Sequence, residues 1–332
     1  MANPTPSAAL RTEPRPRCPL CDGAGDWLHT GLVDRLRAVP GAWRYRRCRD
    51  AACGLVWLDP RPLESELGEV QRGSYTHAAG QPAGTGGGVW GAAQRLWYLT
   101  GVDRTRDQLE RLLLADRRPG RLLEIGCGNG ARLALLRDAG WKVVGQEVDA
   151  EAAAVARQRL GASAIHVGPL AALGLPTAAF DAIASSHVLE HVHEPLVLLR
   201  ECRRLLDPAG ALTAITPNAA SRGHARFGRD WFYLDPPRHL QIFTPRALAA
   251  LAQRAGFTAT VRTTSARAQI VAAASLELRH PALAAGGRVA RSARDLGALV
   301  FQLASHAHDR VARAAGEECV LTARPGASDR AP

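Results

Sequence analysis

From about residue 121 onward, short apolar runs alternate with stretches in which apolar residues recur at helical spacing. Short apolar runs bounded by turn residues are typical of buried strands. A chain that alternates strands and helices in this way predicts a mostly parallel sheet with helices on both faces, an α/β fold. The predicted strands are residues 121–126, 142–147, 163–167, 180–185, 210–216, 257–264 and 318–323, and the predicted helices are residues 130–139, 150–160, 194–206 and 244–255.

Residues 265–316 interrupt this alternation with material rich in alanine and arginine. Its composition predicts a helical insertion before the last strand, and the simplest interpretation is a solvated pair of helices that covers the sheet edge. An apolar stripe of Leu296, Leu299, Val300 and Leu303 offers a second interpretation, because such a stripe fits a membrane surface or another subunit. The sequence leaves the oligomeric state open.

The segment before the sheet divides by composition into three parts. Residues 1–17 are rich in proline and arginine and are expected to be disordered. Residues 18–62 form a small module that carries four cysteines. Residues 63–94 contain a glycine-rich run that is typical of a linker or a mobile lid. The α/β domain then occupies residues 95–332, with the helical insertion inside it.

The overall charge raises one further class of partner. The formal net charge is +11, which is compatible with nucleic acid or an anionic membrane. The arginines are scattered and form no long basic run, which argues against nucleic acid. Neither a signal peptide nor an apolar run of the roughly 20 residues that a membrane span needs is present. We therefore expect a cytoplasmic protein.

Four of the seven cysteines cluster early in the chain, in two pairs. Two such pairs of thiolates are typical of a tetrahedral structural Zn²⁺ site. The module is too small for a substantial core, so metal binding is expected to supply much of its folding energy. Free structural thiols are the alternative. The predicted zinc ligands are Cys18, Cys21, Cys48 and Cys53.

A glycine-rich turn follows the first predicted strand of the sheet. Gly126 and Gly128 remove side chains that would block a ligand, and Gly130 allows the next helix to pack closely on the sheet. Such a turn by itself is also found in dinucleotide-binding folds. Glu124 precedes the turn, where its carboxylate would repel a pyrophosphate but attract a cationic amino-acid group.

A second carboxylate, Glu147, falls at the carboxyl end of the next strand, where it can accept hydrogen bonds from both hydroxyls of a ribose. At this point the sequence resembles class I S-adenosylmethionine-dependent methyltransferases, over about residues 95–264 and the last strand. The resemblance implies a Rossmann-like sheet and a bound S-adenosylmethionine, with Glu147 at the ribose; Asp149 is an alternative two residues later. The implied cofactor-binding residues are Glu124, Gly126, Cys127, Gly128, Gly130, Glu147 and Ser185.

The segments after the fourth and fifth strands resemble a subgroup of that family that acts on small molecules and glycans. In that subgroup they lie over the transferable methyl group and face the acceptor. A hydroxyl acceptor must lose a proton, and imidazole titrates near neutral pH. His239 is therefore the first candidate for the base and His191 the second. The acidic residue that reads adenine in many relatives is missing after the third strand.

The predicted function is methyl transfer from S-adenosylmethionine to a small-molecule or glycan acceptor, most simply at a hydroxyl. C-methylation of a deoxysugar is an alternative, because sugar C-methyltransferases also join a four-cysteine zinc module to this fold. Methylation of ribosomal RNA is a second alternative, since one such group shares the same arrangement. A module that binds the cofactor without turnover is the non-enzymatic alternative.

Overall fold

The computed structural model describes residues 10–71, 117–309 and 314–326, together with residues 105, 107–109, 111, 113, 114 and 311. Residues 1–9 of the terminus expected to be disordered lie outside this part of the chain. So does the predicted linker from residue 72 onward, together with the first residues of the predicted α/β domain.

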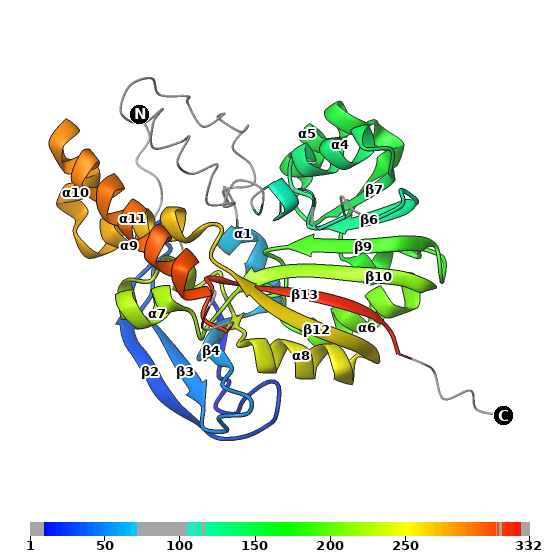
Figure 1. Cartoon of the computed structure of the whole chain (residues 1–332). Helices are drawn as coiled ribbons and strands as arrows, with labels where there is room; N and C mark the ends of the chain where they lie inside the picture. Colours follow the sequence, from blue (N-terminus) through cyan, green and yellow to red (C-terminus); the bar gives the residue numbers. More distant parts are fainter. Residues whose placement is uncertain are drawn as a thin grey trace, which may run out of the picture.

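A seven-stranded sheet forms the centre of the molecule, as predicted. Its strand order is β12-β13-β10-β9-β6-β7-β8 (Figure 1). The five strands from β10 to β8 run parallel, whereas β13 is antiparallel to both of its neighbours. The strands are β6 Arg121–Ile125, β7 Lys142–Glu147, β8 Ile165–Val167, β9 Phe180–Ser186, β10 Leu206–Pro217, β12 Phe257–Thr264 and β13 Glu318–Pro325. The Rossmann-like fold is thereby confirmed.

Helices cover both faces of this sheet because successive strand residues point to opposite sides. Leu122 packs with the buried face of α4 and α5, while its neighbour Leu123 packs with α6 and α8. Figure 1 shows α4 and α5 above the sheet and α6 and α8 below it. These helices are α4 Ala131–Asp138, α5 Ala150–Leu160, α6 Pro195–Leu205 and α8 Pro245–Arg254.

The cysteine-bearing segment folds against the α/β domain and shares a sheet with it. Its strands belong to a four-stranded sheet of order β11-β4-β3-β2. The strand β11 lies about 180 residues later in the sequence than β4. The strands are β2 Gly25–Leu32, β3 Trp43–Cys48, β4 Val56–Leu58 and β11 Gln241–Ile242. Three strands of this sheet come from the cysteine-bearing segment, and the edge strand β11 comes from the domain that the segment covers. We call these four strands the amino-terminal sheet.

The expectation of disorder over residues 1–17 is wrong for the part that the structure describes. Thr12–Glu13 form β1, which pairs antiparallel with β5, Arg61–Pro62. The backbone N–H of Arg15 donates to Asp59 at 2.8 Å, and the carbonyl of Arg15 accepts from the Trp57 indole at 2.7 Å. These hydrogen bonds order residues 10–17, although the proline-rich composition of the segment alone would favour disorder.

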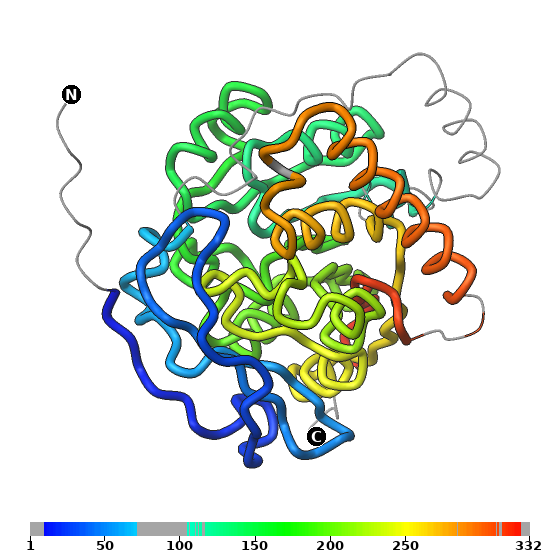
Figure 2. The backbone as a smooth tube through the Cα atoms, turned by 90° about the vertical axis from the view of Figure 1, so that its left-hand side faces the viewer, coloured from blue at the N-terminus to red at the C-terminus, as the bar shows by residue number. Residues whose placement is uncertain are grey.

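The segment between β12 and β13 contains three helices, α9 Ala268–Arg279, α10 Pro281–Ala285 and α11 Arg288–Asp309. Figure 2 shows these helices and the amino-terminal sheet on either side of the segment between β10 and β11. That segment includes α7 Arg222–Phe227 and two short turns, η5 Gly228–Asp230 and η6 Phe232–Leu234. Within the residues that the structure describes, no helix has the length and apolar character needed to cross a bilayer.

Candidate functional site: the carboxyl edge of the sheet

The glycine turn follows β6 and takes backbone conformations that favour glycine. Gly126, Gly128 and Gly130 all have positive φ, at 64°, 54° and 72°. A Cβ on Gly126 would lie 2.6 Å from Val188 Cγ2, so the turn and the segment after β9 are in direct contact. A Cβ on Gly130 would lie 3.0 Å from Ala156 Cβ, which explains the close packing of α4 on α5.

The carboxylate of Glu147 lies at the end of β7 and is held by backbone N–H groups. Gly128 N donates to Oε2 at 2.7 Å, while Val148 N and Asp149 N donate to Oε1 at 2.8 and 3.0 Å. The carboxylate therefore bridges the glycine turn and the end of its own strand. Asp149 caps α5 by accepting from two N–H groups of that helix, which leaves Glu147 as the acid that faces the turn.

The other predicted cofactor residues surround the same edge in different ways. Glu124 is buried, and Arg132 Nη1 of α4 lies 3.4 Å from its Oε1. Ser185 is buried opposite Ile125 in the register of β9 and β6. Cys127 is also buried, but its thiol lies where a Cβ on Gly145 would approach it to 2.7 Å. The Cys127 side chain thus points to β7, and only its backbone can line the turn.

Gln146 is a residue of this edge that the sequence motifs did not predict. Its Oε1 accepts from Gly126 N at 3.3 Å, and its Nε2 donates to the carbonyl of Gly168 at 2.7 Å. One buried amide thus joins the glycine turn to the turn after β8, where no acidic residue is available for adenine. The signal was a polar side chain directly before Glu147, at the buried end of β7.

The turn after β9 places His187 between two buried carboxylates. His187 Nδ1 lies 3.0 Å from Glu190 Oε1, and Nε2 lies 2.9 Å from Glu318 Oε1. Burial alone lowers the pKa of His187, but these carboxylates outweigh it and raise that pKa to about 9. Because a carboxylate only accepts, both ring nitrogens donate and the ring is an imidazolium at neutral pH.

The two carboxylates have further donors. Thr216 Oγ1 donates to Glu190 Oε2 at 2.9 Å, and the Tyr233 hydroxyl donates to Glu318 Oε1 at 2.9 Å. Arg267 Nη1, at the start of α9, donates to the same oxygen of Glu318 at 3.0 Å. Burial acts to raise the pKas of both acids, but the neighbouring cations lower each to about 2. Glu318 and Arg267 had no recognisable motif in the sequence, whereas Tyr233 lies in the segment after the fifth strand that resembles the subgroup.

The two histidines predicted as bases lie side by side below this turn. The rings of His191 and His239 are 4.7 Å apart, edge to face. Nδ1 of His191 lies 3.0 Å from the carbonyl of Arg238, and Nδ1 of His239 lies 2.7 Å from the carbonyl of Tyr233. Burial, with repulsion from His191, lowers the pKa of His239 to about 4. Their catalytic role stays a prediction.

Glu190, His191 and His239 bring potential ligand atoms within 4.8 Å of one another. Both oxygens of Glu190 already have hydrogen-bond partners, one in His187 and one in Thr216. Each histidine is fixed by a backbone carbonyl. These contacts hold the cluster as a hydrogen-bonded support under the strand ends.

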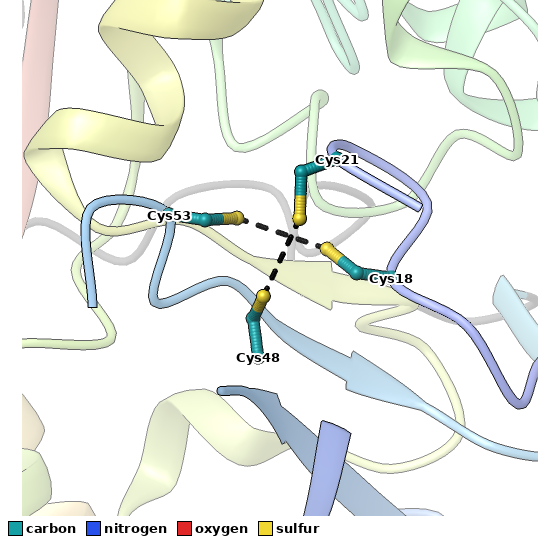
Figure 3. A group of neighbouring side chains, drawn as sticks. All are labelled: Cys18, Cys21, Cys48 and Cys53. Carbon is teal, nitrogen blue, oxygen red and sulfur yellow. Dashed lines mark hydrogen bonds between the residues drawn. The ribbon is translucent and has the colours of Figure 1, made fainter. Parts of the chain in front are cut away.

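The four early cysteines converge at the outer end of the amino-terminal sheet, with all four sulfur atoms within 4.8 Å of one another (Figure 3). The Sγ atoms of Cys18 and Cys53 are 3.7 Å apart, and those of Cys21 and Cys48 are 3.4 Å apart. A tetrahedral Zn²⁺ with bonds of about 2.3 Å needs sulfur atoms roughly 3.8 Å apart. The thiol set therefore fits zinc in both chemistry and spacing.

Comparison with known proteins assigns the domain. Residues 98–261 match a family model described as a methyltransferase domain. A probable S-adenosylmethionine-dependent methyltransferase of Mycolicibacterium smegmatis is 35% identical over 147 residues, or 43% of this chain and 54% of that protein. Residues 98–261 thus form a methyltransferase domain, and the relative named as an S-adenosylmethionine-dependent methyltransferase agrees with the resemblance seen in the sequence.

Two further relatives carry more specific names. A malonyl-[acyl-carrier protein] O-methyltransferase of Serratia marcescens is 33% identical over 142 residues, which cover 42% of this chain and 55% of that protein. A ubiquinone biosynthesis O-methyltransferase of Cereibacter sphaeroides is 32% identical over 149 residues, which cover 41% of this chain and 59% of that protein. The chain spans about half the length of the curated relatives it matches.

Proposed function

We propose that this chain transfers the methyl group of S-adenosylmethionine to an oxygen atom of a small molecule or glycan. The observation that carries the proposal is the pair of carboxylates, Glu124 and Glu147, on either side of the glycine turn. Glu147 is fixed by three backbone N–H groups before any ligand arrives. Two relatives named as O-methyltransferases support oxygen as the acceptor atom.

The residues of the chain contribute mainly position. When bound, S-adenosylmethionine supplies a methyl carbon activated by a sulfonium, and the reaction is an in-line displacement. Glu147 accepts from the ribose hydroxyls, and Glu124 attracts the amino group of the methionine part. The contact between Gly126 and Val188 closes the edge beneath the reacting atoms. Gln146 keeps the two turns of the pocket at a fixed separation.

The substitution Glu147→Ala tests the donor half of the proposal. Loss of a charge-assisted acceptor for two hydroxyls should weaken S-adenosylmethionine binding by roughly tenfold or more, as measured by calorimetry. Glu151→Ala, at an exposed position in the first turn of α5, is the matched control and should leave the affinity unchanged. Equal affinity of the Glu147→Ala protein and the wild type would refute the ribose role.

For a hydroxyl acceptor, His239 or His191 remains the predicted base. His239→Ala should then lower turnover more than cofactor affinity, and retained turnover would exclude His239. Burial of His239 and the carbonyl at its Nδ1 leave only Nε2 for such a role.

We further propose that Cys18, Cys21, Cys48 and Cys53 hold one structural Zn²⁺. The sulfur spacing supports it, and so does the turn at each pair. The carbonyl of Cys18 accepts from Asp22 N at 2.9 Å, and that of Asp50 accepts from Gly54 N at 2.8 Å. None of the seven cysteines forms a disulfide, which supports a reducing, cytoplasmic location.

A further inference from the structure

The charged groups around His187 are layered by depth. The side chains of Glu190 and Glu318 are completely buried, whereas His187 is 27% exposed and Arg267 is 14% exposed. His187 is faced by Glu190 from its own turn, by Glu318 from β13, by Arg267 from α9 and by Tyr233 from η6. The cations form the outer layer and the carboxylates the inner layer.

This layering makes the outer side of a neutral cluster attractive to anions. Two cations balance two carboxylates, but Coulomb energy falls with distance, so a group that approaches from outside meets the cations first. Partial burial reduces the screening of that attraction by solvent. His187 cannot act as a base that removes a proton from an acceptor, because both of its ring nitrogens already donate to carboxylates.

The cluster also lies where the acceptor must bind. His187 follows β9 directly, and Val188 touches the position of a Gly126 Cβ in the cofactor turn. Tyr233 belongs to the segment between β10 and β11 that the family resemblance assigns to the acceptor. Arg267 enters from α9, so the helical insertion contributes a charge to this place.

We propose that the acceptor is a carboxylate, which His187 and Arg267 attract and orient toward the methyl group. This inference rests on the proposed function. An oxygen lone pair of the carboxylate forms the bond to the methyl carbon as the sulfur–carbon bond breaks. The sulfonium becomes a neutral thioether, and the carboxylate becomes a neutral methyl ester. No proton is transferred, so the reaction needs neither His239 nor His191 as a base.

The chemistry of the product tests this proposal even while the acceptor molecule is unidentified. The full chain is incubated with tritium-labelled S-adenosylmethionine and an extract of the source organism, with the same mixture lacking the chain as the blank. Mild alkali hydrolyses methyl esters, so the label should be released as volatile methanol. Label that survives alkali would overturn the carboxylate and leave methyl transfer intact. Absence of any label above the blank would overturn both proposals.

Substitution of Arg267 tests the positioning role. Arg267→Gln should raise by roughly tenfold the amount of extract that gives half-maximal methyl-ester labelling, with the affinity for S-adenosylmethionine unchanged, and Arg267→Lys should recover part of the loss. Arg262→Gln is the matched control, because Arg262 is an exposed arginine on the adjoining strand β12. A labelling defect of equal size in both glutamine variants, or an unchanged half-maximal amount of extract for Arg267→Gln, would contradict the role.

Discussion

At the scale of single residues, the cluster around His187 combines groups that the chain keeps far apart. Glu318 is 131 positions from His187, and Arg267 is 51 positions from Glu318. Glu124 and Glu147 could be predicted because each stands beside a recognisable strand end. Glu318 and Arg267 could not, because only the pairing of β13 with β10 and the placement of α9 bring them to that edge.

The same cluster predicts a pH dependence of stability. His187 has a raised pKa of about 9, so its contribution is complete below the unfolded value near 6.5 and is lost as the pH rises through 9. Glu190 and Glu318 have pKas lowered to about 2, so their contribution is present above about 4.5 and is lost on acidification toward 2. The cluster therefore stabilises the fold most between about pH 4.5 and pH 6.5, where both contributions are complete.

Urea unfolding measures the upper limit. Between pH 6 and pH 9.5, the wild type should lose about 3 kcal/mol of unfolding free energy relative to His187→Gln, which cannot ionise. The difference between the two proteins removes the contribution of other groups, such as the cysteine thiols. Parallel pH profiles for both proteins would show that His187 is not an imidazolium in the folded state.

At the scale of elements, the hydrophobic pattern predicted the strands of the seven-stranded sheet but not the short strands β1 and β11. β1 and β11 have two residues each, too few for a period to be visible. Both are strands because each pairs with a partner strand. β1 pairs with β5 inside the amino-terminal segment, whereas β11 pairs with β4 and forms a junction between that segment and the α/β domain. The turn before β11 adds an ion pair to this junction. Arg238 donates to both oxygens of Asp34, each at 2.8 Å.

The ion pair between Arg238 and Asp34 is buried, which makes its loss costly. Asp34→Ala should lower the unfolding free energy by about 3–5 kcal/mol, because among the described residues it leaves the buried guanidinium paired with Asp235 alone. Asp26→Ala breaks the exposed pair with Arg49 on the same sheet and should cost less than about 1 kcal/mol. Similar losses in the two variants would show that the junction does not depend on the buried pair.

At the scale of the whole molecule, the cysteine module and the methyltransferase domain pack directly against each other. The carbonyl of Cys53 accepts from Thr244 Oγ1 at 2.8 Å, and Thr244 is also the cap of α8. Arg254, at the other end of α8, donates to the carbonyl of Leu20. Residues from both parts, including Tyr45 and Trp231, pack in one hydrophobic cluster. The boundary expected at residue 62 from composition therefore separates two stretches of sequence that fold together.

This arrangement predicts how far the effect of zinc removal extends. Metal analysis should find about one zinc per chain, and a chelator should unfold the thiol turns because the module lacks a core of its own. Hydrogen exchange should then lose protection over β3, β4 and β11, since β11 pairs with β4, while β6 and β7 stay protected. Calorimetry should give the same S-adenosylmethionine affinity before and after chelation, because Glu124 and Glu147 lie in the protected strands.

Unchanged hydrogen exchange in β11 would mean that this end of the segment between β10 and β11 keeps its structure without zinc. A fully protected, metal-free protein would refute the zinc site itself.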